Sequence, residues 1–281
     1  MTTLESIDFN APDADQKFVS SLHEIGFAVL ENHPLDMTLV NEIYQEWRDF
    51  FATDEKFEFE LNKDTQDGYF SFKNAESAKG VEVQDFKEYF HYYPFGQCPA
   101  ALKPKLKQYY QAAQEFAATL LTWVEAHSPQ DIAQRYSQPL SNMIEDSEVT
   151  LLRVLHYPPL DEAANNGEMT WAAAHEDINL LTILPASDAP GLQVQAKDGS
   201  WLEVKSNKNQ VIINTGDMLQ EASEHFFPST SHRVVTPAGI DHSSGRMSLP
   251  LFLHPRPDVV LSERYTAGAY LKERLTELGV I

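Results

Sequence analysis

The spacing of apolar residues changes between about residues 140 and 148, and this change limits the folds open to the chain. Before it, apolar residues recur at helical intervals, as at Phe18, Leu22 and Ile25 and again along residues 104–125. After it, short runs of strand-forming residues alternate with turn residues. Helices followed by many short strands are typical of an α+β protein with a two-sheet β core.

The pattern predicts three regions without an obvious linker. Residues 1–140 form a helix-rich N-terminal region, residues 148–256 form the β core, and residues 262–281 hold a closing helix. Within the core, residues 193–204 are expected to form a hairpin, because an Asp-Gly pair at their centre suits a tight turn.

The stretch His175-Glu176-Asp177, with His232 further along the chain, supplies candidate metal ligands. Two histidines and one carboxylate are what a non-haem Fe(II) centre uses when it keeps positions open for oxygen and a co-substrate. We expect residues 171–184 to form a strand, in which His175 and Asp177 point to the same side. His232 would then complete the set from another strand.

Other interpretations of these histidines stay open at this point. A single His-x-Asp pair also occurs in ordinary cores and surfaces, and His225 could replace His232 as the third ligand. Zinc binds the same ligand types, although the order of the residues does not match the helical motif of zinc proteases.

Arg246 and Ser248 form a second pair that would share one face of a strand. An arginine can bind a carboxylate through two parallel hydrogen bonds, and a serine hydroxyl can add a third. Alone, such an arginine is an ordinary surface residue of an edge strand. Together with the candidate metal ligands, the pair indicates a site that holds one end of a carboxylate-bearing co-substrate.

Several segments occur in an order that is characteristic of one family. They are residues 7–9, 23–29, 152–159, 175–182, 191–194, 214–217, 232–234 and 246–252. In these segments the chain resembles the iron- and 2-oxoglutarate-dependent oxygenases, in the branch that includes isopenicillin N synthase and the plant flavonoid and hormone dioxygenases. The resemblance favours His232 over His225, because Arg233-Val234 follows it as in the family.

The resemblance implies a double-stranded β-helix, which is a jelly-roll core, flanked by helices and with iron in one mouth. His175, Asp177 and His232 would hold Fe(II), and 2-oxoglutarate would bind Arg246 and Ser248. Tyr157 would donate a hydrogen bond to the co-substrate or the substrate. The implied reaction oxidises, most simply hydroxylates, a small molecule with O2 and releases succinate and CO2. Ascorbate is a candidate reductant.

Two positions depart from the family pattern, and two other functions stay open. Glu176 stands where Thr is frequent, and Leu155 stands where many plant members carry an Asn near 2-oxoglutarate. Isopenicillin N synthase uses its Arg-x-Ser pair for a peptide substrate, so a 2-oxoglutarate-independent iron oxidase is one alternative. A non-catalytic jelly-roll protein that binds a metal or a small acid is the other.

Residues 85–93 combine aromatic and charged side chains with one histidine. Lys87, Tyr89 and His91 alternate, so an extended segment would direct all three to one side. The segment resembles the family stretch that crosses the mouth of the jelly roll, which suggests that these residues line the substrate pocket. The alternative is an ordinary amphipathic strand in which Lys87 and His91 are exposed.

Composition excludes some partners and suggests a compartment. The net charge of −21 argues against nucleic acid or an anionic membrane as a partner, because both are polyanionic. Cys98 is the single cysteine, so no intrachain disulfide forms, as expected in a reducing cytosol. Residues 1–8 lack a basic, apolar signal sequence, and no apolar run reaches the ~20 residues of a membrane span. We therefore expect a cytoplasmic protein and make no prediction of its oligomeric state.

Overall fold

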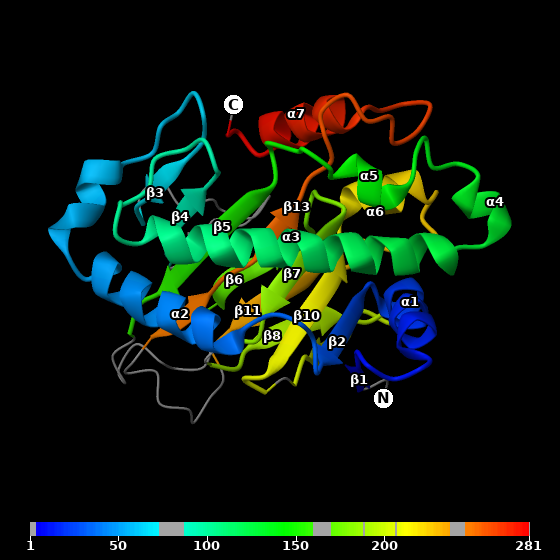
Figure 1. Cartoon of the computed structure of the whole chain (residues 1–281), viewed down its shortest axis with the longest axis horizontal. Coiled ribbons are helices and arrows are strands. Elements are labelled where there is room, and N and C mark those ends of the chain that lie inside the picture. The colour runs from blue at the N-terminus through cyan, green and yellow to red at the C-terminus, as the bar shows by residue number, and fades with distance from the viewer. Residues whose placement is uncertain are drawn as a thin grey trace.

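The computed structural model describes residues 4–72, 87–159, 170–187, 189–205, 207–236 and 245–280, and within them two β-sheets flanked by helices (Figure 1). The larger sheet has the order β1-β2-β10-β7-β13-β5-β4-β3, with β12 also paired to β5. Its strands are β1 (Ser6–Asp8), β2 (Phe27–Glu31), β3 (Gly68–Phe70), β4 (Glu88–Tyr92), β5 (Leu151–Tyr157), β7 (Leu181–Pro185), β10 (Gln210–Thr215), β12 (Arg246–Ser248) and β13 (Leu251–Leu253). The smaller sheet has the order β6-β11-β8-β9, formed by β6 (Thr170–His175), β11 (His232–Val235), β8 (Leu192–Gln195) and β9 (Trp201–Glu203).

The helices lie mainly against one face of the larger sheet, which α3 crosses in Figure 1. They are α1 (Ala14–Ile25), α2 (Met37–Phe51), the 3₁₀ helix η1 (Asp54–Phe59), α3 (Lys103–Ala126), α4 (Gln130–Ala133), α5 (Leu140–Met143), α6 (Asp217–Ala222) and α7 (Ala267–Glu277). The Asp36 carboxylate caps α2 by accepting the backbone N–H groups of Thr38 and Leu39. The helical spacing along residues 104–125 corresponds to α3, and the closing helix expected within residues 262–281 corresponds to α7.

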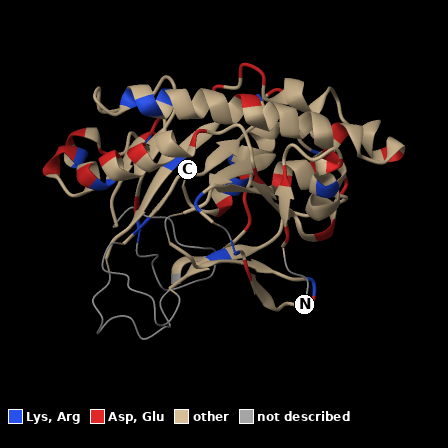
Figure 2. Cartoon of the chain, turned by 60° about the horizontal axis from the view of Figure 1, so that its bottom comes forward, with Lys and Arg blue, Asp and Glu red and all other residues tan. Residues whose placement is uncertain are grey.

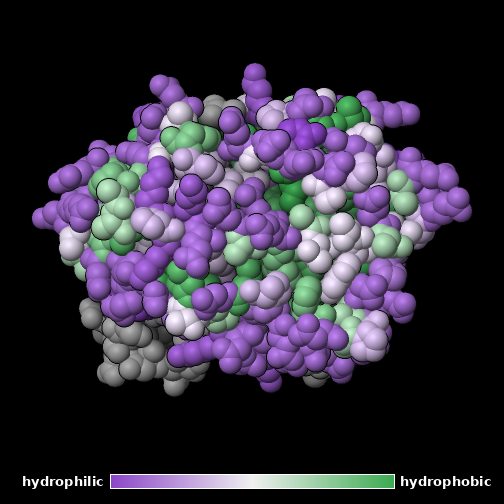
Figure 3. Space-filling view, in the orientation of Figure 1, coloured by the Kyte–Doolittle hydropathy of each residue, from purple (hydrophilic) through white to green (hydrophobic). Residues whose placement is uncertain are grey.

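Strands of the larger sheet are apolar on both faces, because each face is covered. In β2, Ala28 and Leu30 join the core beneath the helices, whereas Phe27 and Val29 join the core between the two sheets. The result is the α+β, jelly-roll arrangement that the sequence implied. The face that carries α3 is mainly hydrophilic (Figure 3). Within the described part of the chain, no helix is both long enough and apolar enough to span a membrane.

The N-terminal region is less purely helical than its periodicity predicts. It contains α1, α2 and α3, but also β1 to β4, which extend the larger sheet on both sides: β2 pairs with β10, and β4 pairs with β5. The physical reason lies in the short buried run of β2, since short apolar segments are read equally well as helix or strand. The alternation of residues 85–93 had already suggested the extended segment that contains β4.

The expected single strand over residues 171–184 is wrong, because β6 and β7 belong to different sheets. β6 ends at His175 and pairs with β11, whereas β7 begins at Leu181 and pairs with β10. The intervening residues carry the chain from one sheet to the other. The expected hairpin of β8 and β9 is present, and Gly199 at its turn has a φ of 84°.

Candidate active site

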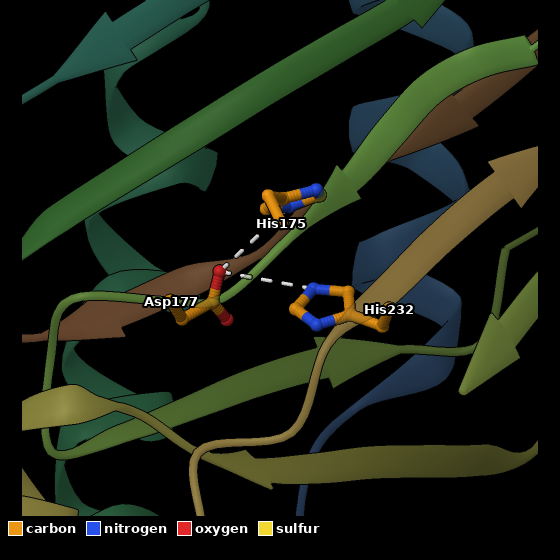
Figure 4. Close-up of side chains that lie close together, drawn as sticks. All are labelled: His175, Asp177 and His232. Carbon is orange, nitrogen blue, oxygen red and sulfur yellow. Dashed lines mark ion pairs between the residues drawn. The ribbon is translucent and has the colours of Figure 1, made fainter. Parts of the chain in front are cut away.

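His175 and His232 lie side by side at the end of the smaller sheet (Figure 4). His175 is the last residue of β6 and His232 the first of β11, and the antiparallel register pairs them directly. Their ring centroids are 4.4 Å apart. Residues that are far apart in sequence therefore meet because of strand pairing.

Asp177 reaches the two histidines from the segment after β6, not from the strand itself. Its Oδ1 lies 4.0 Å from Nε2 of His175 and 3.8 Å from Nε2 of His232. The candidate ligand atoms of these residues all lie within 4.8 Å of one another. The segment is fixed from outside, because the backbone N–H of Asp217 donates to the Asp177 carbonyl at 2.7 Å.

Each of these side chains uses one polar atom for a second contact and directs the other toward its neighbours. Nδ1 of His175 lies 2.7 Å from the Ala173 carbonyl, and Nδ1 of His232 lies 3.1 Å from the Thr230 carbonyl. A carbonyl accepts only from a protonated Nδ1, so Nε2 of each ring keeps a lone pair for a metal.

The second oxygen of Asp177 is held by two strands of the larger sheet. Oδ2 accepts from the Thr182 hydroxyl at 2.5 Å and from the Asn214 amide at 2.7 Å. Thr182 in β7 and Asn214 in β10 are themselves cross-strand partners. Oδ1 is thus left facing the histidines, and the sheet register sets the orientation of the carboxylate.

The electrostatics favour the protonation states that a metal requires. Burial alone would raise the pKa of Asp177, but the two imidazoles and the bonds from Thr182 and Asn214 outweigh it and lower that pKa. Burial and the nearby His232 lower the pKa of His175. The His175 side chain is 41% exposed, so solvent moderates this shift, but its direction keeps the ring neutral at pH 7. The Nε2 lone pairs of the two histidines and one anionic oxygen fit a divalent metal of the iron type, with the remaining positions open.

A cavity beside these residues contains the other predicted cofactor-binding side chains. Tyr157, Arg246 and Ser248 all line it. Arg246 pairs with Tyr157 in the register of β12 and β5, and Ser248 pairs with Leu155. Leu155 also lines the cavity, so the departure from the family's Asn places an apolar wall beside Ser248.

Arg246 is buried, with 3% of its surface exposed. It has polar contacts with the segment that connects β7 to β8. Its Nη1 donates to the backbone carbonyls of Ala189 and of Pro190, the latter at 2.7 Å. The preceding Gly245 has a φ of 66°, and a Cβ there would lie 2.5 Å from the Tyr157 carbonyl. Glycine therefore permits the close approach of β12 to β5 that directs Arg246 into the cavity.

The predicted substrate residues divide into one that lines the cavity and two that do not. Lys87 lines it and is 7% exposed. Tyr89 and His91 face the same side of β4, as the alternation predicted, but they are buried and lie behind the guanidinium of Arg153. That group is 4.5 Å from the Tyr89 ring centroid, and its Nε donates to Nε2 of His91 at 2.8 Å. The structure thus revises the expected direct contact of Tyr89 and His91 with the pocket.

Arg153, Thr182 and Asn214 are site residues that the sequence patterns did not single out. All of them line the cavity. Arg153 alternates with Leu155 and Tyr157 along β5, so the predicted position of Tyr157 already implied the same face. The contacts of Thr182 and Asn214 with Asp177 depend on which strands pair, for which the sequence carries no local signal.

His225 lies apart from the candidate site. It is exposed, follows α6 and has a φ of 66°. In the part of the chain that the structure describes, one group of three or more His, Cys, Asp or Glu residues could hold a metal, and it consists of His175, Asp177 and His232.

Comparisons with known protein families match both halves of the chain. The 2OG-Fe(II) oxygenase superfamily matches residues 148–255, and the N-terminal region of non-haem dioxygenases in morphine synthesis matches residues 4–118.

Similar proteins come from bacteria and plants. A Shewanella oneidensis protein, described as a candidate oxygenase, is 53% identical over the full length of both chains, with a TM-score of 0.90. A Caulobacter crescentus protein of the 2OG-Fe(II) oxygenase family is 28% identical, with 99% of this chain and 100% of that chain covered and a TM-score of 0.80. Gibberellin 2-beta-dioxygenase 3 of Arabidopsis thaliana is 25% identical over 89% of this chain and 74% of its own length.

Proposed function

Because this chain belongs to the iron- and 2-oxoglutarate-dependent oxygenases, we propose that His175, Asp177 and His232 hold its Fe(II). The convergence of their Nε2 and Oδ1 atoms, each side chain being fixed through its other polar atom, is the observation that carries this assignment. Bound there with 2-oxoglutarate, the iron supplies the oxidising power that hydroxylates a substrate while succinate and CO2 are released.

The chain's own contribution to co-substrate binding is assigned to β12 and β5. Arg246 and Ser248 would bind the distal carboxylate of 2-oxoglutarate, and the Tyr157 hydroxyl would donate to the co-substrate. The burial of Arg246 supports this role, because a carboxylate there would be shielded from water and its hydrogen bonds strengthened. The contacts of Arg246 with the carbonyls of Ala189 and Pro190 would hold the guanidinium in place.

The substrate is proposed to be a small molecule, and the protein to act in the cytoplasm. The cavity is lined by residues of both sheets and opens to one side, which suits a metabolite rather than a polymer. Relatives named for gibberellin support a small organic substrate. The net charge of −21 and the single cysteine are consistent with a cytoplasmic protein that does not bind nucleic acid or anionic membranes.

The test is succinate formation by the purified protein supplied with Fe(II), 2-oxoglutarate, ascorbate and air. We expect slow succinate production without a primary substrate and faster production when a metabolite set contains the substrate. Substrate-dependent oxygen uptake that continues without 2-oxoglutarate would instead identify an oxidase of the isopenicillin N synthase type. Tight binding of iron and 2-oxoglutarate with no succinate under any condition would indicate a binding protein without turnover.

A further inference from the structure

Arg153 is held in the cavity wall by three neighbours. Its Nε donates to Nε2 of His91, and Nδ1 of His91 lies 3.0 Å from the Gln66 carbonyl, which fixes the imidazole as an acceptor toward Arg153. The guanidinium lies 4.5 Å from the Tyr89 ring centroid and 5.3 Å from that of Phe252. Arg153 is half-buried, so part of this restrained cation remains accessible.

Arg153 and Arg246 occupy different parts of the cavity. Arg246 pairs with Tyr157, and Arg153 stands four residues earlier on β5, so about 13 Å of strand separates the two backbone positions. Arg153 instead contacts Phe252, the cross-strand partner of the Thr182 that holds Asp177. It therefore lies toward the metal end, where a substrate must place its reacting carbon, and Arg246 lies further along.

The described residues that line the cavity include three cations, Lys87, Arg153 and Arg246, against one carboxylate, Asp177. This local excess of positive charge contrasts with the protein's net charge of −21. Figure 2 shows Asp and Glu spread over the helices and outer loops. In the proposed function, Asp177 serves the metal and Arg246 serves 2-oxoglutarate, and neither role uses Lys87 or Arg153.

We infer that the primary substrate of this enzyme carries a carboxylate, which Arg153 binds and Lys87 helps to attract. A guanidinium that is already oriented by His91, Tyr89 and Phe252 loses little freedom when it binds, and its planar edge matches a carboxylate. His91 is then a positioning residue. This gives a role to a histidine that does not line the cavity but accepts a hydrogen bond from Arg153, which does. The inference rests on the proposed function, in which Arg246 is taken by 2-oxoglutarate.

The test compares acids with uncharged molecules of the same shape. Acetate and acetamide, benzoate and benzamide, and phenylacetate and phenylacetamide are titrated by calorimetry into anaerobic protein saturated with Fe(II) and 2-oxoglutarate. We expect at least one acid to bind roughly tenfold or more tightly than its amide, the ratio for one charge-assisted hydrogen bond. If no acid binds better than its amide, whether both bind or neither does, the inference is wrong.

Variants locate the source of the preference. Arg153→Gln should abolish it, whereas Arg135→Gln, which removes the same charge from an exposed position, should retain it. His91→Ala should weaken the preference, and His91→Gln should restore much of it, because an amide oxygen can replace Nε2 as the acceptor. An undiminished preference in Arg153→Gln, with a melting temperature close to that of the native protein, would assign the anion to another residue.

Failure of this inference can be distinguished from failure of the proposed function. Succinate formation by the native protein without any acid preference leaves the enzyme assignment intact and removes the carboxylate site. An acid preference that depends on Arg153, in a protein that never forms succinate, retains the site and removes the enzymatic role.

Discussion

One nitrogen of His232 is left for the metal, so a single substitution should remove the site. His232→Ala deletes this nitrogen and leaves Asp177 facing one imidazole. We expect stoichiometric binding of Ni(II) or Mn(II) to be lost, together with succinate formation, as measured by equilibrium dialysis and metal analysis. His225→Ala is the matched control and should bind metal normally, because His225 is exposed and outside the cluster. Tight, stoichiometric binding by His232→Ala would overturn the ligand assignment.

Arg246 tests the co-substrate site independently of the metal ligands. Removal of a buried, hydrogen-bonded charge partner should weaken 2-oxoglutarate binding by roughly 2–5 kcal/mol. Titration of 2-oxoglutarate into the anaerobic iron protein measures this, with Arg135→Ala as a surface control. Unchanged affinity in Arg246→Ala would mean that Arg246 and Ser248 bind a different carboxylate, such as that of the substrate.

The sequence predicted the site residues that lie close together in the chain, and it missed the site residues whose contacts depend on strand pairing. His175 and Asp177 were found because they are two residues apart, and Arg246 and Ser248 for the same reason. Asn214 of β10 contacts Asp177 in the segment before β7, and Arg153 of β5 contacts His91 of β4. These contacts require the sheet register, which no local pattern specifies.

The segment between β6 and β7 depends on a glycine that has no unusual backbone angle. A Cβ at Gly216 would lie 2.3 Å from the Asn179 carbonyl and 2.8 Å from the Asp177 carbonyl. Gly216→Ala should therefore cost roughly 1–3 kcal/mol of stability by overpacking and also weaken metal binding, because the segment that carries Asp177 must shift.

Gly199 supplies the control for this glycine. It has a φ of 84° and nothing within 4 Å of an added Cβ. Gly199→Ala should lower the free energy of unfolding by about 1 kcal/mol through backbone strain while leaving Ni(II) affinity unchanged. Urea unfolding and Ni(II) titration of both variants test the pair. Equal metal affinities in the two variants would show that the segment tolerates displacement.

Strands β3, β4 and β5 meet α2 and η1 around a buried carboxylate. Glu88 accepts from Tyr69 at 2.6 Å, from Lys56 at 3.0 Å and from Nδ1 of His156 at 2.8 Å. Burial opposes ionisation of Glu88, but the contacts with His156, Tyr69 and Lys56 outweigh it and lower its pKa. A carboxyl whose pKa is lower in the folded state stabilises the fold above its unfolded pKa and loses that effect as pH falls.

Glu88→Gln should therefore destabilise the protein most at neutral pH. We expect a loss of roughly 1–3 kcal/mol at pH 7, since hydrogen bonds to a charged group are replaced by weaker ones. The difference from the native protein should narrow below about pH 4.5, the ordinary value for a glutamate, as Glu88 becomes protonated. Urea unfolding of both proteins from pH 7 to pH 3 measures it. A difference that stays constant with pH would exclude ionisation of Glu88 as its source.

Elements with long or simple periodicity were the ones that the sequence predicted well. The helical spacing of apolar residues along 104–125 correctly predicted α3, and the Asp-Gly pair correctly predicted the hairpin of β8 and β9. The short strands β1 to β3 were missed because each has only three to five residues and gains its stability from sheet neighbours, whereas the alternation of residues 85–93 did indicate β4. The break between β6 and β7 was missed because alternation within one segment does not reveal a change of sheet.

Across the whole molecule, the proposed ligands connect the two sheets. His175 and His232 end strands of the smaller sheet, whereas Arg246 and Ser248 lie in the larger one, and Asp177 is fixed to the larger sheet by Thr182 and Asn214. A metal would therefore join the two sheets at one mouth, and 2-oxoglutarate would extend that connection along β12. Ligands that bind only the folded state stabilise it by mass action.

Metal and co-substrate should accordingly stabilise the protein in a defined order. At a hundred times its dissociation constant, each ligand should add about 2.7 kcal/mol to the free energy of unfolding. The melting temperature should rise with Mn(II), rise again with 2-oxoglutarate, and return to its starting value with excess EDTA. Arg246→Ala should keep the increment from Mn(II) and lose most of that from 2-oxoglutarate. His232→Ala should lose the increment from Mn(II) and most of the increment from 2-oxoglutarate, because the co-substrate is proposed to bind both the metal and Arg246. An undiminished increment from 2-oxoglutarate in metal-free His232→Ala would show that the co-substrate binds without the metal centre and does not connect the sheets.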